Sequence, residues 1–254
     1  KIVIKEPQIE PLIRKYGGAY EMLNNKWRYC LWLNNVSPQT IKKSIFLISR
    51  ISACENFRRN STSQSVHSKL VTPSIFGDIR QPSSDYILFP RVSSHRRKYL
   101  PLGYISKNTI LADSAYGLPN AELFHFGVLQ SVMHNSWMRV IAGKLKSDYR
   151  YSSTLVYNNF PWPKEPSEKN KKKVEDKAQK VLDVREEFPE SSLADLYDPL
   201  TMPPKLVKVH QELDKAVDLC YRPKAFTTEN ARIEFLFDLY NQYTSVLFKK
   251  KKKK

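Results

Sequence analysis

The sequence contains few of the residues that build disulfide frameworks, zinc sites and nucleotide-binding loops. Its 254 residues include three cysteines, Cys30, Cys54 and Cys220, which are far apart and form no Cys-x-x-Cys pair. This spacing argues against disulfides and zinc, and it favours a reducing compartment such as the cytoplasm. The chain has seven glycines and no glycine-rich loop between a strand and a helix, so it offers no site for a nucleotide or for S-adenosylmethionine.

Long apolar runs are also missing. No run approaches the roughly 20 apolar residues that a membrane-spanning helix needs, so we expect no membrane partner. No secretory signal opens the chain, which begins at Lys1 rather than at Met, so we expect a processed protein or a fragment of a longer one. Hydrophobic residues make up 41% of the sequence, which is enough to build a core.

What the sequence has in excess is positive charge. The net charge is +17, and residues 1–162 contain 22 Lys or Arg against 9 Asp or Glu. Residues 163–254 contain 20 against 16, and six of those 20 form the tail Lys249 to Lys254. A basic excess confined to the first part predicts a polyanionic partner such as nucleic acid. The alternative is a basic surface that is only solvated.

The sequence predicts an α+β protein with a boundary near Phe160. Pro161, Pro163 and Pro166 interrupt regular structure there, and the charge balance changes at the same place. We expect a mixed α/β domain at 1–162, followed by a helical domain at 163–254 that carries the basic tail. The apolar periodicity of the second part predicts helices at 169–185 and 205–221, with a last helix capped by Thr228.

In the first part, Ser37-Pro38 predicts the start of a helix with Ile41, Ile45, Ile48 and Ile51 on its apolar face. Strands are predicted at 86–89 and 99–105, with a basic turn between them. One long helix is predicted from Asn120 to a C-cap at Gly143. A short strand is then expected at 154–157.

The segment after this helix, Lys144 to Tyr151, alternates cations, an anion and tyrosines. Lys146 and Asp148 are two residues apart, so in an extended segment they point to the same side. A lysine can bind guanine and an aspartate can accept from cytosine N4, so together they could read one G·C pair. An internal ion pair of Asp148 with Lys146 or Arg150 explains the pattern equally well.

A second basic segment, Ser93 to Lys98, suits phosphate binding through Arg96, Arg97 and Lys98, with a solvated turn as the alternative. A hydrolase triad can be written from Ser93, His95 and Asp148, but no nucleophile elbow supports it. His125 and His134 are nine residues apart and would face opposite sides of one helix, so we expect packing or surface roles rather than a shared metal.

Several segments, in their order along the chain, resemble parts of the MmeI-like (type IIL) restriction-modification enzymes. Two of them, Phe89–Tyr104 and Gly143–Ser152, contain the basic segments described above. The others are Arg28–Leu33, Pro119–Ala121 with Phe124–Gly127, Val156–Pro163, Leu193–Pro204 and Leu213–Asp218. Matches of this kind over nearly the whole chain are more specific than any single motif.

Members of this family join a nuclease, an S-adenosylmethionine-dependent adenine-N6 methyltransferase and a target-recognition domain with a helical C-terminal part. The resemblance implies that this chain is only the recognition part, in the bacterial cytoplasm, with the cofactor and all catalytic residues in a methyltransferase domain elsewhere in the parent polypeptide. Whether the parent also cleaves DNA depends on a domain outside this chain. The hexalysine tail is not part of the family pattern and could be a solvated terminus or an added phosphate contact.

By position, the resemblance makes Lys146, Asp148 and Arg150 base-reading residues, with Ser114 as a weaker match to another. With the phosphate contacts expected from the sequence, the set of phosphate-binding residues is Arg96, Arg97, Lys98, Lys144, Tyr149 and Tyr151. The expected function is sequence-specific recognition of double-stranded DNA. The alternative is a non-specific nucleic-acid-binding or assembly module, and no sequence feature favours a free-standing hydrolase.

Overall fold

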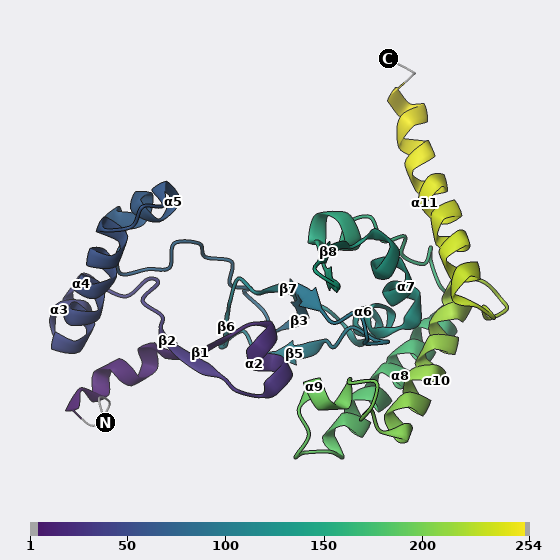
Figure 1. Ribbon diagram of the computed structural model, residues 1–254, viewed down its shortest axis with the longest axis horizontal. Helices are drawn as coiled ribbons and strands as arrows, with labels where there is room; N and C mark the ends of the chain where they lie inside the picture. Colours follow the sequence, from purple (N-terminus) through teal and green to yellow (C-terminus); the bar gives the residue numbers. More distant parts are fainter. Residues whose placement is uncertain (1–4, 252–254) are drawn as a thin grey trace.

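A computed structural model describes residues 5–251 of the chain and the side chains as far as residue 245. The molecule is elongated, with a helical lobe at one end, β-sheets in the middle and a bundle of helices at the other end (Figure 1). The sheets have the strand orders β2-β1-β6, β5-β3-β7 and β4-β9-β8. This is the expected α+β architecture, with a mixed α/β part followed by a helical part.

The N-terminal part consists mainly of short elements. In chain order these are η1 (Pro7–Leu12), β1 (Ile13–Gly17), α2 (Ala19–Asn24), β2 (Arg28–Leu31), α3 (Pro38–Lys42), α4 (Ile45–Arg59), α5 (Gln64–His67) and η2 (Ser68–Val71). Ile9, Leu33 and Leu47 form the small core of the N-terminal lobe. Met22 of α2 lies outside this core and is buried with Tyr86 and Leu88.

The prediction of one helix starting at Pro38 was wrong, because the chain forms two. Ser37 caps α3, and Ser44 caps α4 by accepting the N–H of Leu47 at 3.1 Å. The Ser44 hydroxyl also donates to Glu6, which is far away in sequence. Half of the expected apolar face is confirmed, because Ile41 and Ile51 pack against the core of Ile9, Leu33 and Leu47. The other half was wrong, since Ile45 and Ile48 are 83% and 45% exposed.

The remaining strands lie between the lobe and the bundle. They are β3 (Tyr86–Pro90), β4 (Val92–Ser93), β5 (Gly103–Ile105), β6 (Ile110–Leu111), β7 (Ala115–Pro119), β8 (Gly143–Leu145) and β9 (Asp148–Arg150). The strand predicted at 86–89 is confirmed as β3. Of the strand predicted at 99–105 only its end, β5, pairs in a sheet. Residues 99–102 instead bind side chains of the neighbouring helices.

The long helix predicted from Asn120 is also two helices, α6 (Leu123–Gln130) and α7 (Val132–Ile141). Ser131 separates them with an extended backbone, at φ −79° and ψ 164°. Asn120 precedes the first helix with a positive φ of 54°, and Gly143 belongs to β8 rather than to a helix cap. The strand predicted at 154–157 is the short π-helical turn η3 (Ser153–Tyr157).

The helices predicted after the boundary are confirmed as α8 (Glu168–Glu186), α10 (Pro204–Tyr221) and α11 (Glu229–Lys251). The Thr228 hydroxyl accepts the N–H of Ala231 at 3.1 Å, as expected of the cap. A short helix that the sequence did not predict, α9 (Leu193–Leu196), precedes α10. Residues 252–254 of the lysine tail lie outside the described residues. Among the residues that the structure describes, none of the helices combines the length and the apolar character of a membrane span.

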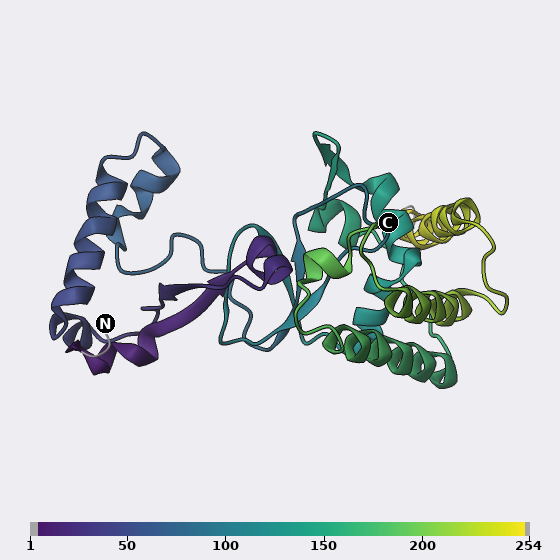
Figure 2. The ribbon, with the colours of Figure 1, turned by 60° about the horizontal axis from the view of Figure 1, so that its bottom comes forward.

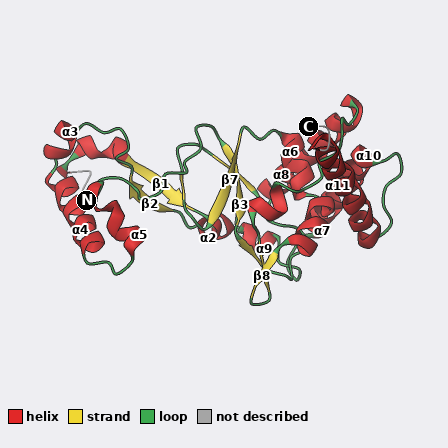
Figure 3. Ribbon diagram, turned by 90° about the horizontal axis from the view of Figure 1, so that it is seen from above, coloured by secondary structure: helices red, strands yellow, loops and turns green. Residues whose placement is uncertain are grey.

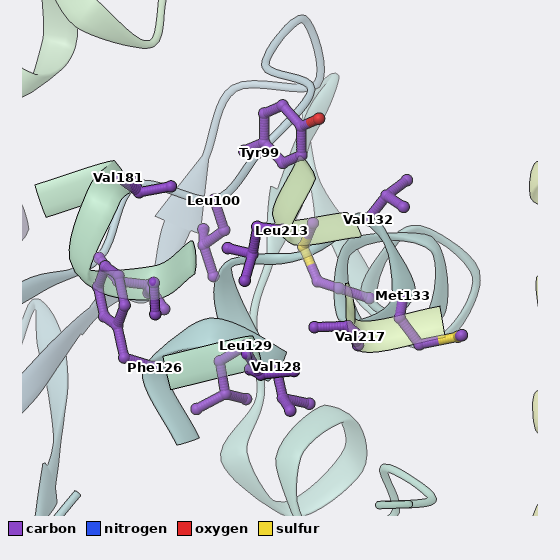
Figure 4. Close-up of a cluster of buried hydrophobic side chains, with 14 of the residues drawn as sticks. Tyr99, Leu100, Phe126, Val128, Leu129, Val132, Met133, Val181, Leu213 and Val217 are labelled. Carbon is purple, nitrogen blue, oxygen red and sulfur yellow. The ribbon is translucent and has the colours of Figure 1, made fainter. Parts of the chain in front are cut away.

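One large core crosses the predicted boundary. Phe126, Leu129 and Met133 of the first part are buried together with Val181, Leu213 and Val217 of the second (Figure 4). Gly127 of α6 makes this contact close, because a Cβ there would lie 2.6 Å from the Val174 side chain of α8. The helical part is therefore packed directly against the part that carries the sheets.

Candidate nucleic-acid interface

The segment after α7 is a β-hairpin made of β8 and β9. Leu145 pairs with Asp148, so Lys146 and Ser147 form a two-residue turn. Lys146 adopts φ 56°, the left-handed conformation that such turns require. The hairpin projects from the body of the molecule (Figure 3). In Figure 2 it rises on the same side of the β1–β2 ribbon as the lobe formed by α3 to α5.

The expectation that Lys146 and Asp148 point to the same side of an extended segment was wrong in its geometry. Lys146 lies in the turn, whereas Asp148 is the first residue of β9. Both still sit at the outer end of the hairpin, where Lys146 and Ser147 are exposed. A tight turn thus presents the two side chains together at a tip instead of along one face.

The partner of Asp148 is His95, and the ion pairs of the described residues include none between Asp148 and either Lys146 or Arg150. The backbone N–H of His95 donates to Asp148 Oδ1 at 3.2 Å, and His95 Nδ1 lies 3.4 Å from the same oxygen. The Asp148 side chain remains 41% exposed. The contact with His95 fixes the carboxylate while leaving part of it open to a ligand.

The basic segment 93–98 lies beside the hairpin because β4 pairs with β9. Val92 is opposite Arg150 and Ser93 is opposite Tyr149. A turn follows, in which the N–H of Arg97 donates to the Ser94 carbonyl at 3.2 Å. Arg96 and Lys98 are exposed at this turn. Two cationic elements distant in sequence are therefore joined in one sheet.

Arg97 has different surroundings from those of its neighbours. It is half-buried, and its Nε is buried without a hydrogen-bond partner among the described residues. Burial lowers the pKa of its guanidinium, against the attraction of Asp198 and Asp148. Arg97 therefore adds positive charge close to Asp148 from a half-buried position.

Two more predicted residues lie on the hairpin strands. Lys144 is opposite Tyr149, and its ammonium lies 3.4 Å from the centre of the Tyr149 ring. Arg150, at the end of β9, is exposed. Lys144, Tyr149 and Arg150 thus form a basic and aromatic surface along the hairpin, which can contact phosphates and sugars.

The assignment of Tyr151 as a phosphate-binding residue was wrong. Its side chain is 2% exposed in the main core, and its hydroxyl lies 3.0 Å from Nε2 of the buried His134. Burial raises the pKa of Tyr151 well above its ordinary value and lowers that of His134 to about 3. Both side chains help to pack the hairpin base against α7, where neither can reach DNA.

Ser114 lies apart from the hairpin, in the exposed turn between β6 and β7. Its carbonyl accepts the N–H of Arg91 at 3.2 Å, and Arg91 follows β3 directly. The Arg91 guanidinium donates to the Asp113 carbonyl at 2.6 Å and lies 4.8 Å from the centre of the Tyr116 ring. Arg91 is not among the DNA-binding residues predicted from the sequence, although it lies directly before the basic segment 93–98.

The structure assembles neither the hydrolase triad of Ser93, His95 and Asp148 nor a metal site at His125 and His134. His95 and Asp148 do meet, but Ser93 is 3% exposed and is held in strand β4. His125 and His134 lie on two separate helices. No group of His, Cys, Asp or Glu among residues 5–251 could hold a metal ion.

Comparisons with known proteins agree with this arrangement. Residues 1–164 match the family described as "MmeI, target recognition domain", and residues 166–248 match "MmeI, C-terminal domain". DNA methyltransferase A of Bacillus subtilis (strain 168) is 40% identical over 240 residues, which are 94% of this chain and 27% of that protein.

A solved structure is also similar. It is described as "Structure of Type IIL restriction-modification enzyme MmeI in complex with DNA has implications for engineering of new specificities". It is 43% identical, superposes with a TM-score of 0.91, and the match covers 96% of this chain and 32% of that one. The chain therefore spans about a third or less of the proteins that it matches.

Proposed function

The chain belongs to the MmeI family, in which it corresponds to the target-recognition domain and the C-terminal domain, and on this premise we propose how it reads a specific sequence in double-stranded DNA. The β8–β9 hairpin enters the major groove, which is wide enough to admit a two-stranded ribbon. Lys146, Asp148 and Arg150 contact base edges, with Asp148 accepting from cytosine and Lys146 donating to guanine. The observation that carries this proposal is the exposed hairpin tip, whose one carboxylate is held by His95 and forms no ion pair with Lys146 or Arg150.

Phosphate contacts fix the register of the hairpin in the groove. These contacts come from two elements, which are the turn that follows β4, with Arg96 and Lys98, and the hairpin itself, with Lys144 and Tyr149. Both elements can bind phosphates of the DNA strands that border the groove. Arg97 supplies charge from a half-buried position. Ser114 and the neighbouring Arg91 provide a second, separate contact to the DNA.

The two parts of the chain differ in role. We assign DNA contact to residues 1–162 and bracing of the contact surface to residues 163–254. The parent polypeptide is a DNA adenine-N6 methyltransferase that binds S-adenosylmethionine in its own catalytic domain and flips the target adenine out of the duplex. That domain is the intramolecular partner of this chain, and the bacterial cytoplasm, where the chromosome lies, is its place of action.

The test is to sequence the modified bases in DNA from a host that carries the full gene. One short sequence methylated at every occurrence supports the proposal. A competition assay with the purified full-length protein at physiological salt addresses the alternative. Equal affinity for unrelated duplexes would favour a non-specific nucleic-acid-binding or assembly module instead.

Replacing Arg96 by Ala is expected to weaken binding to all duplexes to a similar extent. Loss of one phosphate contact should reduce the slope of log affinity against log salt concentration by about 1. The measurement is a salt titration of DNA affinity, with Lys173→Ala on the exposed face of α8 as the matched control. An Arg96 variant that keeps the wild-type slope, or that changes the preferred sequence, would contradict the phosphate-binding role.

A further inference from the structure

A single carboxylate, Asp214 of α10, contacts both the residue that follows the basic turn 93–98 and the first residue of α7, the helix that leads into the β8–β9 hairpin. Asp214 is 7% exposed. Its Oδ2 accepts the hydroxyl of Tyr99 at 2.7 Å, and its Oδ1 accepts the backbone N–H of Val132 at 2.7 Å. Figure 4 shows Tyr99 and Val132 in the buried cluster around Leu213, the residue that precedes Asp214.

Tyr99 is the end of the phosphate-binding turn. It follows Lys98 directly, its side chain is 1% exposed, and its ring stacks on His210 of α10 at 4.1 Å. The next residues are also held by side chains, since the N–H of Leu100 donates to Asn135 at 2.6 Å and the Leu102 carbonyl accepts from Arg185 at 2.8 Å. The base of the turn is therefore bound by side chains of three helices, α7, α8 and α10.

Val132 is the first residue of α7, the helix that leads into the hairpin. The N-cap residue of this helix, Ser131, makes no side-chain capping bond, so Asp214 does what a capping side chain usually does. A negative charge at this end also favours the helix dipole. Because α7 ends at Ile141 and β8 begins at Gly143, a shift of α7 would move the hairpin directly.

We propose that Asp214 is a positioning residue for DNA recognition, which sets the placement of the phosphate-binding turn relative to the base-reading hairpin. This inference rests on the proposed function. The two segments meet again at the surface, where the His95 N–H holds Asp148. The placement of the turn relative to the hairpin is thus fixed at two points. One is the buried contact of Asp214 with Tyr99 and Val132, and the other is the surface contact of His95 with Asp148.

Stability should depend on the protonation of Asp214. Burial raises its pKa to about 6, although Val132, Tyr99, Lys98 and Arg232 favour the ionised form. The folded state therefore binds this proton more tightly than the unfolded state, in which the pKa is close to 4. The free energy of unfolding contributed by Asp214 is largest below about pH 4 and falls as the pH rises through 6. Denaturant titrations should compare the wild type with Asp214→Asn, which cannot titrate at this position. The wild-type free energy of unfolding minus that of the variant should fall as the pH rises from 4 through 6, because the buried His134 and His210 titrate in both proteins and cancel in the difference.

The deciding experiment uses the full-length protein and a library of duplexes with randomised sequence. The retained duplexes identify the preferred site, and affinity is then measured for that site and for a version with one base pair changed. The variants are Asp214→Ala, Asp214→Asn and Tyr99→Phe. The matched control is Asp218→Ala, since Asp218 lies one turn further along α10, is fully buried, and pairs instead with Arg232 of α11 at 2.7 Å.

Asp214→Ala and Tyr99→Phe are expected to lose affinity for the preferred duplex by roughly tenfold, the effect of one hydrogen bond to a charged group. They should also lose part of the discrimination ratio, which is the affinity for the preferred duplex divided by the affinity for the duplex with one base pair changed. Asp214→Asn, which keeps an acceptor oxygen, should recover most of that ratio. Asp218→Ala should keep the wild-type ratio even where its melting temperature falls as far.

Wild-type ratios in both Asp214→Ala and Tyr99→Phe, or an equal loss in Asp218→Ala, would overturn the inference. If Asp214→Ala does not melt cooperatively, Tyr99→Phe decides, because it removes one hydroxyl without removing the buried carboxylate. A wild-type protein that retains all duplexes equally would overturn the proposed function itself, which separates the two failures.

Discussion

Exchanging the charges at the hairpin tip, with Lys146→Asp and Asp148→Lys in one protein, is expected to change the base pair preferred at one position of the site. An acid in place of the lysine can no longer donate to guanine, and a lysine in place of the aspartate can no longer accept from cytosine. Contacts of this kind discriminate between base pairs by about 1–3 kcal/mol. The preferred pair should therefore change while overall affinity for the best duplex is largely retained.

The measurement is selection from a randomised duplex library with the full-length protein, followed by sequencing. The matched control is Ser147→Ala, which alters the same turn without altering its charges and should keep the wild-type preference. Affinity lost evenly over all sequences by the exchanged variant would show that these residues hold the backbone and do not read bases.

Replacing Trp137 by Ala is expected to give the largest loss of stability. Trp137 of α7 is 2% exposed, and its Nε1 donates to the Val156 carbonyl at 3.0 Å. Its ring packs against Phe237 and Tyr240 of α11, at centroid distances of 5.4 and 5.8 Å. Removing a buried Trp side chain costs about 3–5 kcal/mol and here leaves a cavity between the two parts of the chain.

Thermal and denaturant unfolding measure this loss. Trp27→Ala is the matched control, because Trp27 is only partly buried and packs against a separate cluster that contains Met22 and Tyr86, not against the main core. The Trp137 variant should lose several times more stability than the control and should unfold in one transition. Similar losses in both variants, or two separate transitions in the wild type, would mean that the main core does not join the two parts.

The elements that were predicted correctly depend on local pattern. The helices α8, α10 and α11 each carry an apolar stripe that repeats at helical spacing and a recognisable start, such as Ser167, Pro204 or Thr228. Basic residues are clustered within each of the segments 93–98 and 144–150, and this local clustering predicts two basic surface segments. The pairing of β4 with β9, which brings these segments together, is a long-range contact that the local pattern does not predict.

The errors in the fold have long-range causes. The break between α6 and α7 depends on Asp214, 82 residues away, which caps α7. The break between α3 and α4 depends on Glu6, 38 residues before Ser44. A hydrophobic pattern records neither contact, so a continuous helix was the simplest interpretation in both places.

The errors at the interface have similar causes. The turn Lys146-Ser147 lacks the Asn-Gly or Asp-Gly pair that most often identifies a hairpin, so its sequence predicts an extended segment. The sequence around Tyr151 predicts an exposed side chain, because nothing local shows that its hydroxyl bonds to the buried His134. The local sequence cannot distinguish an open Asp148 from an internal ion pair, because its partner His95 lies 53 residues away.

The close contact at Gly127 also limits how related genes can exchange segments. A Cβ at this position would lie 2.6 Å from Val174, 3.2 Å from Ala178 and 3.3 Å from Leu213, all of which come after the proline-rich boundary. A chimera joined at that boundary would combine an α6 and an α8 selected in different ancestors, and any larger side chain on either helix would force them apart. Recombination that swaps recognition specificity should therefore succeed more often when it transfers residues 1–254 as one inherited block.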